Sequence, residues 1–140
     1  MDFHYLLMAN HAMVQKCLMK KLSDTGLTLG QPKILDYLGK HNGASQTEIA
    51  ASCHIEAASL TSALNGMEAK GLVERRRMNG NRRTYHIYLT PRGEDMYRKV
   101  TAAFGEIERE IFADIPEETA AQFGDVFAEI YNRLKDRMEE

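Results

Sequence analysis

One stretch of the sequence decides the fold: LVERRRMNGNRRTYHIYLT, residues 72–90. Its halves, LVERRR and RRTYHIYLT, have the composition of strands and flank residues 78–81, where Asn-Gly is a strong signal for a tight turn between antiparallel strands. In the returning half, Tyr85, Ile87 and Leu89 alternate with more polar residues. The stretch therefore predicts a β-hairpin with one face packed against helices.

Two short helices are expected immediately before the hairpin. The run SQTEIAASC begins with Ser45-x-x-Glu48, a capping box in which the serine hydroxyl and the glutamate carboxylate each satisfy a backbone amide. We expect Glu48 to serve as a cap and nothing else. In the second helix, Leu60, Leu64 and Met67 form an apolar stripe, and small polar residues lie on its other faces. Two such helices have the proportions of a helix-turn-helix.

Further helices flank this unit. Gly26 ends a first amphipathic helix, Pro32 starts the next, and Thr90-Pro91 caps a helix after the hairpin. Apolar residues at helical spacing predict the first helix and two long terminal ones: Phe3, Leu7, Val14, Cys17 or Leu18, and Leu22; Val100, Phe104, Ile107 and Ile111; Phe123, Phe127, Ile130 and Leu134. A core of this size cannot easily cover all these faces, so we expect them to pair with a second copy of the chain. The alternative is an antiparallel pair within one chain.

Charge is distributed unevenly along the 140 residues, whose formal net charge is -2. Residues 1–69 carry -1, residues 70–92 carry +6 and residues 93–140 carry -7. A local cationic patch of this kind is suited to a polyanion, although a solvated charged hairpin would account for the same residues. A hydrophobic content of 44%, with no long apolar run and no signal peptide, predicts a soluble, single-domain cytoplasmic protein with no membrane partner.

Motifs for other chemistry are missing from the sequence. It has no Gly-rich phosphate loop, no H-E-x-x-H and no nucleophile elbow, so we expect no enzyme and no cofactor. His4 and His11 share a helical face but lack a further ligand, so no metal site is expected. Cys17 and Cys53 are expected to be reduced, buried and inert, with oxidant sensing as the alternative.

The order of these elements resembles the MarR family of bacterial winged-helix transcriptional regulators, over nearly the whole chain. The resemblance is most specific in LTLGQPKILDYL, SQTEIA, MEAKGLVERR and RRTYHIYLTPRGEDM. It implies a mainly α fold with a small β-hairpin wing. In that arrangement residues 1–140 form one domain, with a winged helix-turn-helix lobe over residues 28–90. Helical dimerisation regions over residues 1–25 and 91–140 flank the lobe.

The resemblance also implies a homodimer that binds a pseudo-palindromic double-stranded DNA operator, as a repressor that responds to a small aromatic or phenolic effector. We expect hydroxyls and an amide of the second short helix near base edges, the start of the first short helix and Arg75 to Arg77 near phosphates, and the hairpin tip in a minor groove. The residues expected at DNA are Ser45, Gln46, Thr47, Ser59, Thr61, Ser62, Asn65, Arg75, Arg77, Arg82 and Arg83. The residues of the effector pocket cannot be read from the sequence.

Two positions depart from the family pattern. Asn81 stands where the family commonly has an aspartate that orients the wing arginines, and Ser62 stands where many relatives carry an arginine. The alternative function is a winged-helix protein-interaction module with a basic hairpin and no specific DNA target, in which the polar helix positions simply face solvent. Tyr85 and Tyr88 are expected to pack within the hairpin rather than to stack on bases.

Overall fold

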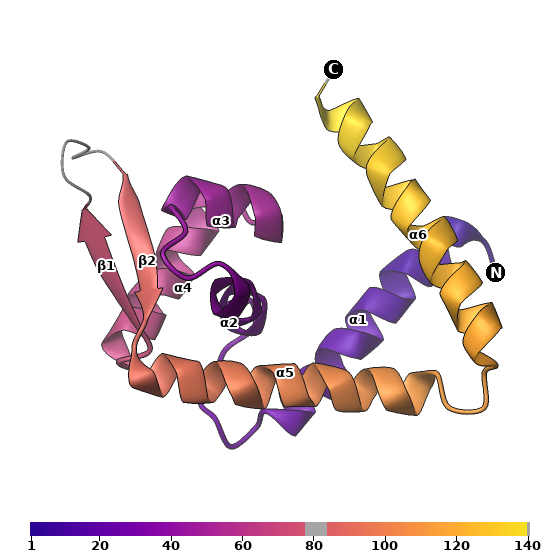
Figure 1. The fold of residues 1–140 in the computed structure, drawn as a ribbon, viewed down its shortest axis with the longest axis horizontal. Helices are drawn as coiled ribbons and strands as arrows, with labels where there is room; N and C mark the ends of the chain where they lie inside the picture. The colour runs from indigo at the N-terminus through magenta and orange to yellow at the C-terminus, as the bar shows by residue number, and fades with distance from the viewer. Residues whose placement is uncertain (78–83, 140) are drawn as a thin grey trace. The chain divides into compact units, whose positions relative to one another are not determined.

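The computed structural model describes residues 1–77 and 84–139, and these form six helices and a two-stranded antiparallel sheet (Figure 1). In chain order the elements are α1 (Phe3–Lys21), α2 (Gln31–Lys40), α3 (Gln46–Cys53), α4 (Ala57–Ala69), β1 (Val73–Arg77), β2 (Tyr85–Leu89), α5 (Pro91–Ile111) and α6 (Glu117–Met138). The predicted mainly α fold with a small hairpin is therefore confirmed. The predicted turn at residues 78–81 lies outside the described residues.

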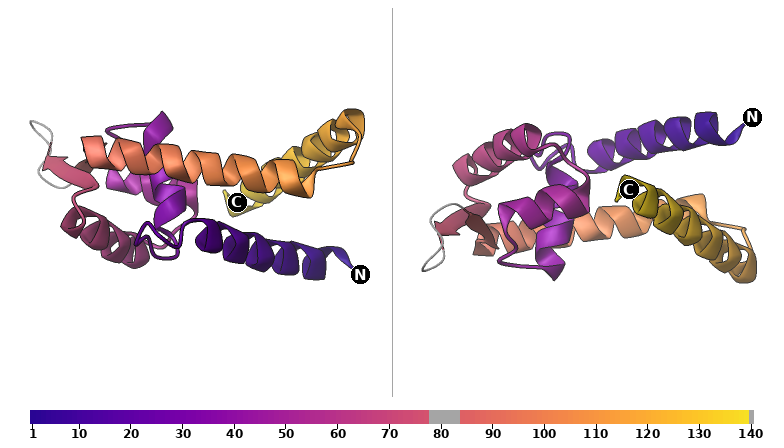
Figure 2. Two further views of the ribbon diagram at one scale, coloured as in Figure 1. Left: turned by 90° about the horizontal axis from the view of Figure 1, so that it is seen from below. Right: turned by 90° about the horizontal axis from the view of Figure 1, so that it is seen from above.

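The chain divides into two compact units, Met1–Ile107 and Glu108–Glu140. The first unit holds α1 to α4, the hairpin and most of α5, and its elements are seen from two further sides in Figure 2. The second unit holds the end of α5 and α6. None of the helices in the described residues has the length and apolar character that a membrane crossing needs.

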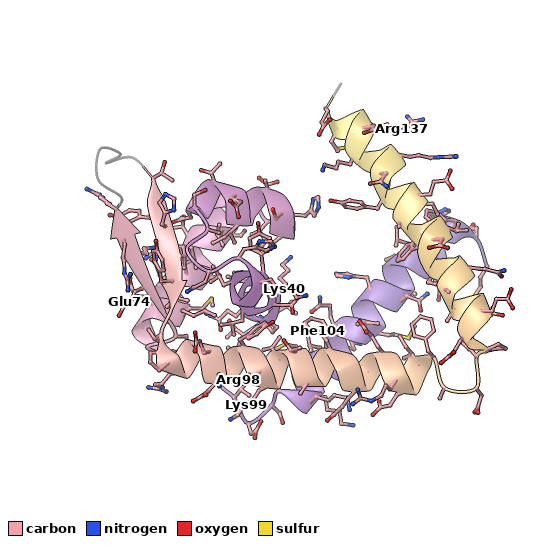
Figure 3. All side chains as sticks on the ribbon, in the orientation of Figure 1. Lys40, Glu74, Arg98, Lys99, Phe104 and Arg137 are labelled. Carbon is pink, nitrogen blue, oxygen red and sulfur yellow. The ribbon has the colours of Figure 1, made fainter. Side chains whose placement is uncertain are left out.

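The core of the first unit is built from the apolar stripes that the sequence predicts. The large fully buried side chains come from every helix of the unit, from the residue before β1 and from β2: Leu18, Ile34, Leu35, Leu38, Ile49, Leu60, Leu64, Met67, Leu72, Ile87 and Val100. Phe104 of α5 packs against this core, whereas Arg98 and Lys99 lie on the opposite side of the same helix (Figure 3). The helical periodicity thus identifies the buried stripe of α4 and most of the stripe of α5.

The two strands of the hairpin are antiparallel, and Ile87 lies on the face that was predicted to pack against the helices. The strands pair from Val73 opposite Leu89 to Arg77 opposite Tyr85. Ile87 is fully buried, and its backbone also exchanges hydrogen bonds with the segment before α3: the Gly43 amide donates to the Ile87 carbonyl at 2.8 Å, and the Ile87 amide donates to the Ala44 carbonyl at 2.9 Å. β2 is therefore held on both edges, which fixes the hairpin to the helix-turn-helix.

A second junction joins the base of the hairpin to the start of α5. The Thr90 hydroxyl donates to the Gly71 carbonyl at 2.6 Å and accepts from the Gly93 amide at 3.0 Å, which confirms the predicted cap. The backbone here is close enough to exclude a side chain, since a Cβ at Gly93 would lie 2.0 Å from the carbonyl oxygen of Leu72. Glycine at this position allows α5 to approach the hairpin.

The start of α3 differs in one respect from the expected capping box. Ser45 accepts a hydrogen bond from the Glu48 amide at 3.1 Å, as predicted. The Glu48 carboxylate, however, accepts a 2.6 Å hydrogen bond from the Tyr37 hydroxyl of α2, so the prediction that Glu48 is only a cap is wrong. The phenol is a strong donor within reach of the carboxylate, and this hydrogen bond raises the pKa of Tyr37. Glu48 thereby links α2 to α3.

The apolar stripes of α1 and α6 are largely exposed in a single chain. Leu18 is the buried residue of α1, whereas Phe3 and Leu7 near its start are exposed. α6 has no buried residue along its described length, and Phe123 remains 53% exposed although its ring lies 5.3 Å from that of Phe127. These two helices leave a large apolar surface uncovered.

The prediction that both cysteines are buried is wrong for Cys17, which is exposed, and Cys53 is only half-buried. The helical stripe could pass through either residue 17 or residue 18, and the fold places Leu18 inward, with 1% of its surface exposed. Burial raises the pKa of the Cys53 thiol. The thiol of Cys53 is accordingly less ionised than that of an ordinary cysteine.

Candidate nucleic-acid interface

The outward face of α4 carries the small polar residues predicted to meet base edges. Ser59, Thr61, Ser62 and Asn65 are all exposed. They alternate with the buried Leu60, Leu64 and Met67 at the spacing of a helix packed on one side only. This face presents hydroxyl and amide groups and no long side chain, so a helix of this kind can approach another surface closely.

The start of α3 is joined to α4 by side-chain hydrogen bonds. Gln46 donates from Nε2 to the Thr61 hydroxyl oxygen at 3.0 Å. The Thr61 hydroxyl in turn donates to the Ala57 carbonyl at 3.0 Å, one helical turn earlier. Two residues expected at DNA, Gln46 and Thr61, thus contact each other, whereas Ser45 uses its hydroxyl as the helix cap and Thr47 is exposed.

A hollow of about 280 Å³ lies where α3, α4 and β2 begin. Its lining residues are Gln46, Thr47, Ala50, Ala57, Leu60, Thr84 and Tyr85. The residues come from three elements that are separate in sequence, so no local pattern identifies the hollow. Two residues predicted at DNA, Gln46 and Thr47, thus share one concavity with the start of α4 and the start of β2.

Arg75 of β1 points at α4 instead of at solvent. Its guanidinium donates from Nη1 to the Asn65 side-chain oxygen at 2.7 Å and from Nη2 to the Thr61 carbonyl at 3.4 Å. It also lies 3.5 Å from the Glu68 carboxylate, and only 14% of its side chain is exposed. Arg75, which the sequence predicts as a phosphate contact, therefore links the hairpin to α4 through its side chain.

The two following arginines lie on tyrosine rings of β2. Arg76 is 4.3 Å from the centre of the Tyr88 ring and forms a 2.9 Å ion pair with Glu74, which is labelled on β1 in Figure 3. Arg77 is 4.7 Å from the centre of the Tyr85 ring and donates to its hydroxyl at 2.7 Å. Both guanidinium groups are exposed but partly fixed in position, because stacking on a ring restricts the long side chain. The tyrosines pack within the hairpin, as predicted, and Arg82 and Arg83 lie outside the described residues.

Gln31, a buried residue that the sequence analysis did not identify, is hydrogen-bonded to Lys70 at the C-terminal end of α4. Gln31 is only 3% exposed, and its side-chain oxygen accepts from the Thr28 amide and from the Lys70 ammonium, both at 3.0 Å. Lys70 also donates to the Gly26 carbonyl at 2.6 Å. A polar residue in the first turn of a helix normally faces solvent, so its sequence gives no signal of this role. Lys70 counts toward the cationic stretch but acts inside the fold.

Metal chemistry finds no support in the part of the chain that the structure describes. No group of three or more His, Cys, Asp or Glu side chains there could hold a metal ion. His86 instead lies 2.8 Å from the Gly43 carbonyl through Nδ1, a contact that further fixes β2 to the segment before α3.

A helix-turn-helix followed by a hairpin, with a polar outward helix face and flanking arginines, defines a winged-helix protein. A profile described as MarR family matches residues 25–84. The HTH-type transcriptional regulator BilQ of Clostridium symbiosum is 28% identical over 102 residues, which cover 73% of this chain and 71% of that protein. Residues 25–84 of this chain are therefore similar to the MarR family of winged-helix transcriptional regulators, the family that the sequence predicts.

Solved structures of transcriptional regulators have the same fold. The crystal structure of transcriptional regulator PA3341 has a TM-score of 0.87 and 28% sequence identity, and the match covers 96% of this chain and 99% of that one. The complex of Staphylococcus aureus MepR with DNA has a TM-score of 0.88 at 23% identity, covering 95% of this chain and 98% of that one. At that identity the second likeness establishes the fold alone.

Proposed function

We propose that this chain is a sequence-specific DNA-binding regulator that binds a pseudo-palindromic operator as a homodimer. One observation carries the proposal: the starts of α3, α4 and β2 line one concavity, and Gln46 in its lining contacts Thr61 on the exposed polar face of α4. A winged-helix lobe uses these elements to contact phosphates, base edges and an adjacent groove. The similarity to the MarR family, and the DNA complex of the structurally similar MepR, favour double-stranded DNA as the polyanion.

The proposed role of each side chain follows from its exposure and from the hydrogen-bonding group or charge that it carries. Ser59 and Ser62 are exposed hydroxyls on α4, suited to base edges. Thr47 lies in the first turn of α3, where backbone amides and the helix dipole favour a phosphate. Arg77 is exposed and preoriented by Tyr85, which suits a phosphate contact. For Arg82 and Arg83 the sequence argument stands, and we propose that they enter a minor groove.

A second copy of the chain is the proposed partner for the exposed apolar helices. We propose that residues 1–25 and 91–140 form the dimerisation region and that residues 28–90 form the DNA-binding lobe. The exposed apolar residues of α6 support this, since a helix with no buried residue gains little from folding unless another surface covers it. A two-fold dimer would place two lobes on the two halves of a pseudo-palindrome.

The proposed mode of regulation is ligand-responsive repression in the cytoplasm. A dimer on an operator that overlaps a promoter excludes RNA polymerase, which makes repression the expected sign. A small aromatic or phenolic compound, bound between the dimerisation helices and the lobe, would change the spacing of the two lobes and release DNA. A panel of phenols and aromatic acids tested for release of bound operator examines this part; a panel without any effect would contradict it.

The central test is fluorescence anisotropy with the DNA upstream of the chain's own gene and with a shuffled duplex of the same composition. We expect tight, selective binding whose logarithm falls linearly with the logarithm of salt concentration. The double variant Arg82→Ala/Arg83→Ala should lose most of this affinity. Equal weak binding to both duplexes would reject that operator, and a shallow salt dependence with tight binding to another protein would favour the protein-interaction alternative.

A further inference from the structure

The hydrogen-bonding polarity of Asn65 is fixed by its contact with Arg75. An arginine side chain has five donors and no acceptor, so the atom that receives its 2.7 Å hydrogen bond must be the side-chain oxygen of Asn65. The amide cannot be turned over without placing its NH₂ group against the guanidinium. Asn65 is therefore held with its oxygen toward β1, and among the residues that the structure describes none contacts its two N–H donors.

Arg75 is itself held firmly enough to impose this orientation. Besides Asn65, it donates to the Thr61 carbonyl at 3.4 Å and lies 3.5 Å from the Glu68 carboxylate. All three partners belong to α4, and only 14% of the Arg75 side chain is exposed. A nearly buried charge with three acceptors around it does not reorient without leaving those acceptors unpaired.

The same reasoning applies one turn earlier on α4. The Thr61 hydroxyl donates to the Ala57 carbonyl, which can only accept, so its oxygen is the acceptor for Nε2 of Gln46. Thr61 therefore contacts Gln46 of α3 through its side chain and Arg75 of β1 through its carbonyl. The polar face of α4 is oriented by both neighbouring elements of the proposed DNA-binding surface.

We propose that Arg75 is a positioning residue that makes Asn65 a hydrogen-bond donor in the major groove, so that Asn65 selects guanine over adenine. This inference rests on the proposed function. Guanine presents two acceptors there, N7 and O6, which suit the two N–H donors of Asn65. Adenine presents N7 together with an amino donor, and a freely rotating asparagine reads that pair with its oxygen and its NH₂ group. In this protein the side-chain oxygen of Asn65 already accepts from Arg75. The positive charge of Arg75 beside that oxygen disfavours the approach of the adenine amino group, which is also a donor.

Selection from a pool of duplexes with a randomised core tests the proposal. The wild-type protein should enrich guanine over adenine at one symmetric position in each half-site. Asn65→Asp keeps the oxygen that Arg75 contacts but replaces the donors with an acceptor, and it should lose about tenfold of that enrichment and leave the other positions unchanged. Arg75→Ala frees the amide, and the preference at the same position should move from guanine toward adenine.

Arg77→Ala is the matched control on the same strand. It should weaken binding to all sequences and lower the slope of log affinity against log salt by about one, without changing the preferred base. Arg75→Ala should leave that slope unchanged, because its guanidinium contacts α4 and no phosphate. A structural role alone would reduce affinity and leave base identity intact.

Two results would overturn the inference while the proposed function stands. One is an Asn65→Asp variant that selects the wild-type sequence at every position. The other is an Arg75→Ala variant that keeps the wild-type base preferences and loses only affinity. A wild-type protein that enriches no sequence would instead overturn the proposed function, and this inference with it.

Discussion

Gly93 of α5 should tolerate no side chain, because the backbone at the base of the hairpin lies against it. A Cβ at this position would sit 2.0 Å from the carbonyl oxygen of Leu72 and 3.2 Å from a methyl group of Leu89. An ordinary carbon–oxygen contact is about 3.3 Å or longer, so Gly93→Ala requires backbone atoms to separate by about 1 Å. Only backbone can move, since the obstructing atom is not on a side chain.

The size of the effect can be worked out from three contributions. Replacing glycine by alanine within a helix normally stabilises it by about 1 kcal/mol. Against this, forcing an extra methyl into a packed site costs about 2 kcal/mol. Moving Leu72 also strains its 3.0 Å hydrogen bond from the Thr90 amide, which contributes about 1 kcal/mol. We therefore expect Gly93→Ala to lower the free energy of unfolding by about 2 kcal/mol.

Urea unfolding followed by far-ultraviolet circular dichroism measures this difference, at one protein concentration because a dimer's stability depends on it. The matched control is Gly124→Ala in α6, where nothing lies within 4 Å of the added carbon, and which should gain up to about 1 kcal/mol. A Gly93→Ala protein as stable as the wild type would refute the reasoning, since helix propensity would then outweigh the contact with Leu72.

Three further perturbations follow from single contacts. Thr90→Val should destabilise the protein by about 1 kcal/mol in the same assay while Thr90→Ser does not, because the hydroxyl caps α5; equal losses would point to the methyl group. Iodoacetamide at pH 8 should modify Cys17 faster than Cys53, since Cys17 is exposed and burial raises the pKa of Cys53; mass spectrometry showing the reverse order would contradict this. The hydrogen bond to Glu48 raises the pKa of Tyr37 above 10.0, so its contribution to stability holds below pH 10 and is lost as the pH rises through the raised pKa. Glu48→Gln should lower that pKa in an absorbance titration of the phenolate, and an unchanged titration would be evidence against the contact.

Local features of the chain were predictable because local physics determines them. The caps at Ser45 and Thr90 depend on backbone amides three residues away, and the inward face of β2 depends on alternation within one short stretch. The buried stripe of α4 follows from a spacing that only a helix satisfies. None of these needs knowledge of which elements later pack together.

The orientation of Arg75 needed more than its immediate neighbourhood, yet a signal for it was present. Side chains alternate along a strand, so Arg75 shares a face with Val73, which is buried, whereas Glu74 and Arg76 lie on the other face. Alternation thus places Arg75, the first of three consecutive arginines, on a different face from both of its sequence neighbours. What it cannot supply is the acceptor, because Asn65 comes from a different helix.

The Glu48 and Cys17 predictions failed for a related reason. Glu48 satisfies a motif for a cap, but Tyr37 of α2 provides a donor that the motif does not include. Cys17 and Leu18 are adjacent in α1, and the apolar spacing of the helix allows either of them to face the core. Which of the two is buried depends on the rotation of α1 about its own axis. The sequence of a single helix does not determine that rotation.

The internal use of basic residues changes what the charge of the hairpin means. Residues 70–92 carry a net charge of +6, but Lys70 is bonded to Gln31 and Gly26, and Arg75 is bonded to α4. Lysine and arginine only donate, so they are well suited to satisfy loop carbonyls and side-chain oxygens inside a small fold. The net charge of a stretch is therefore an upper bound on its phosphate contacts. DNA affinity should therefore depend on salt concentration less steeply than a charge of +6 suggests. Lys70 and Arg75 stabilise the fold of the lobe, and the remaining basic residues are left to contact phosphates.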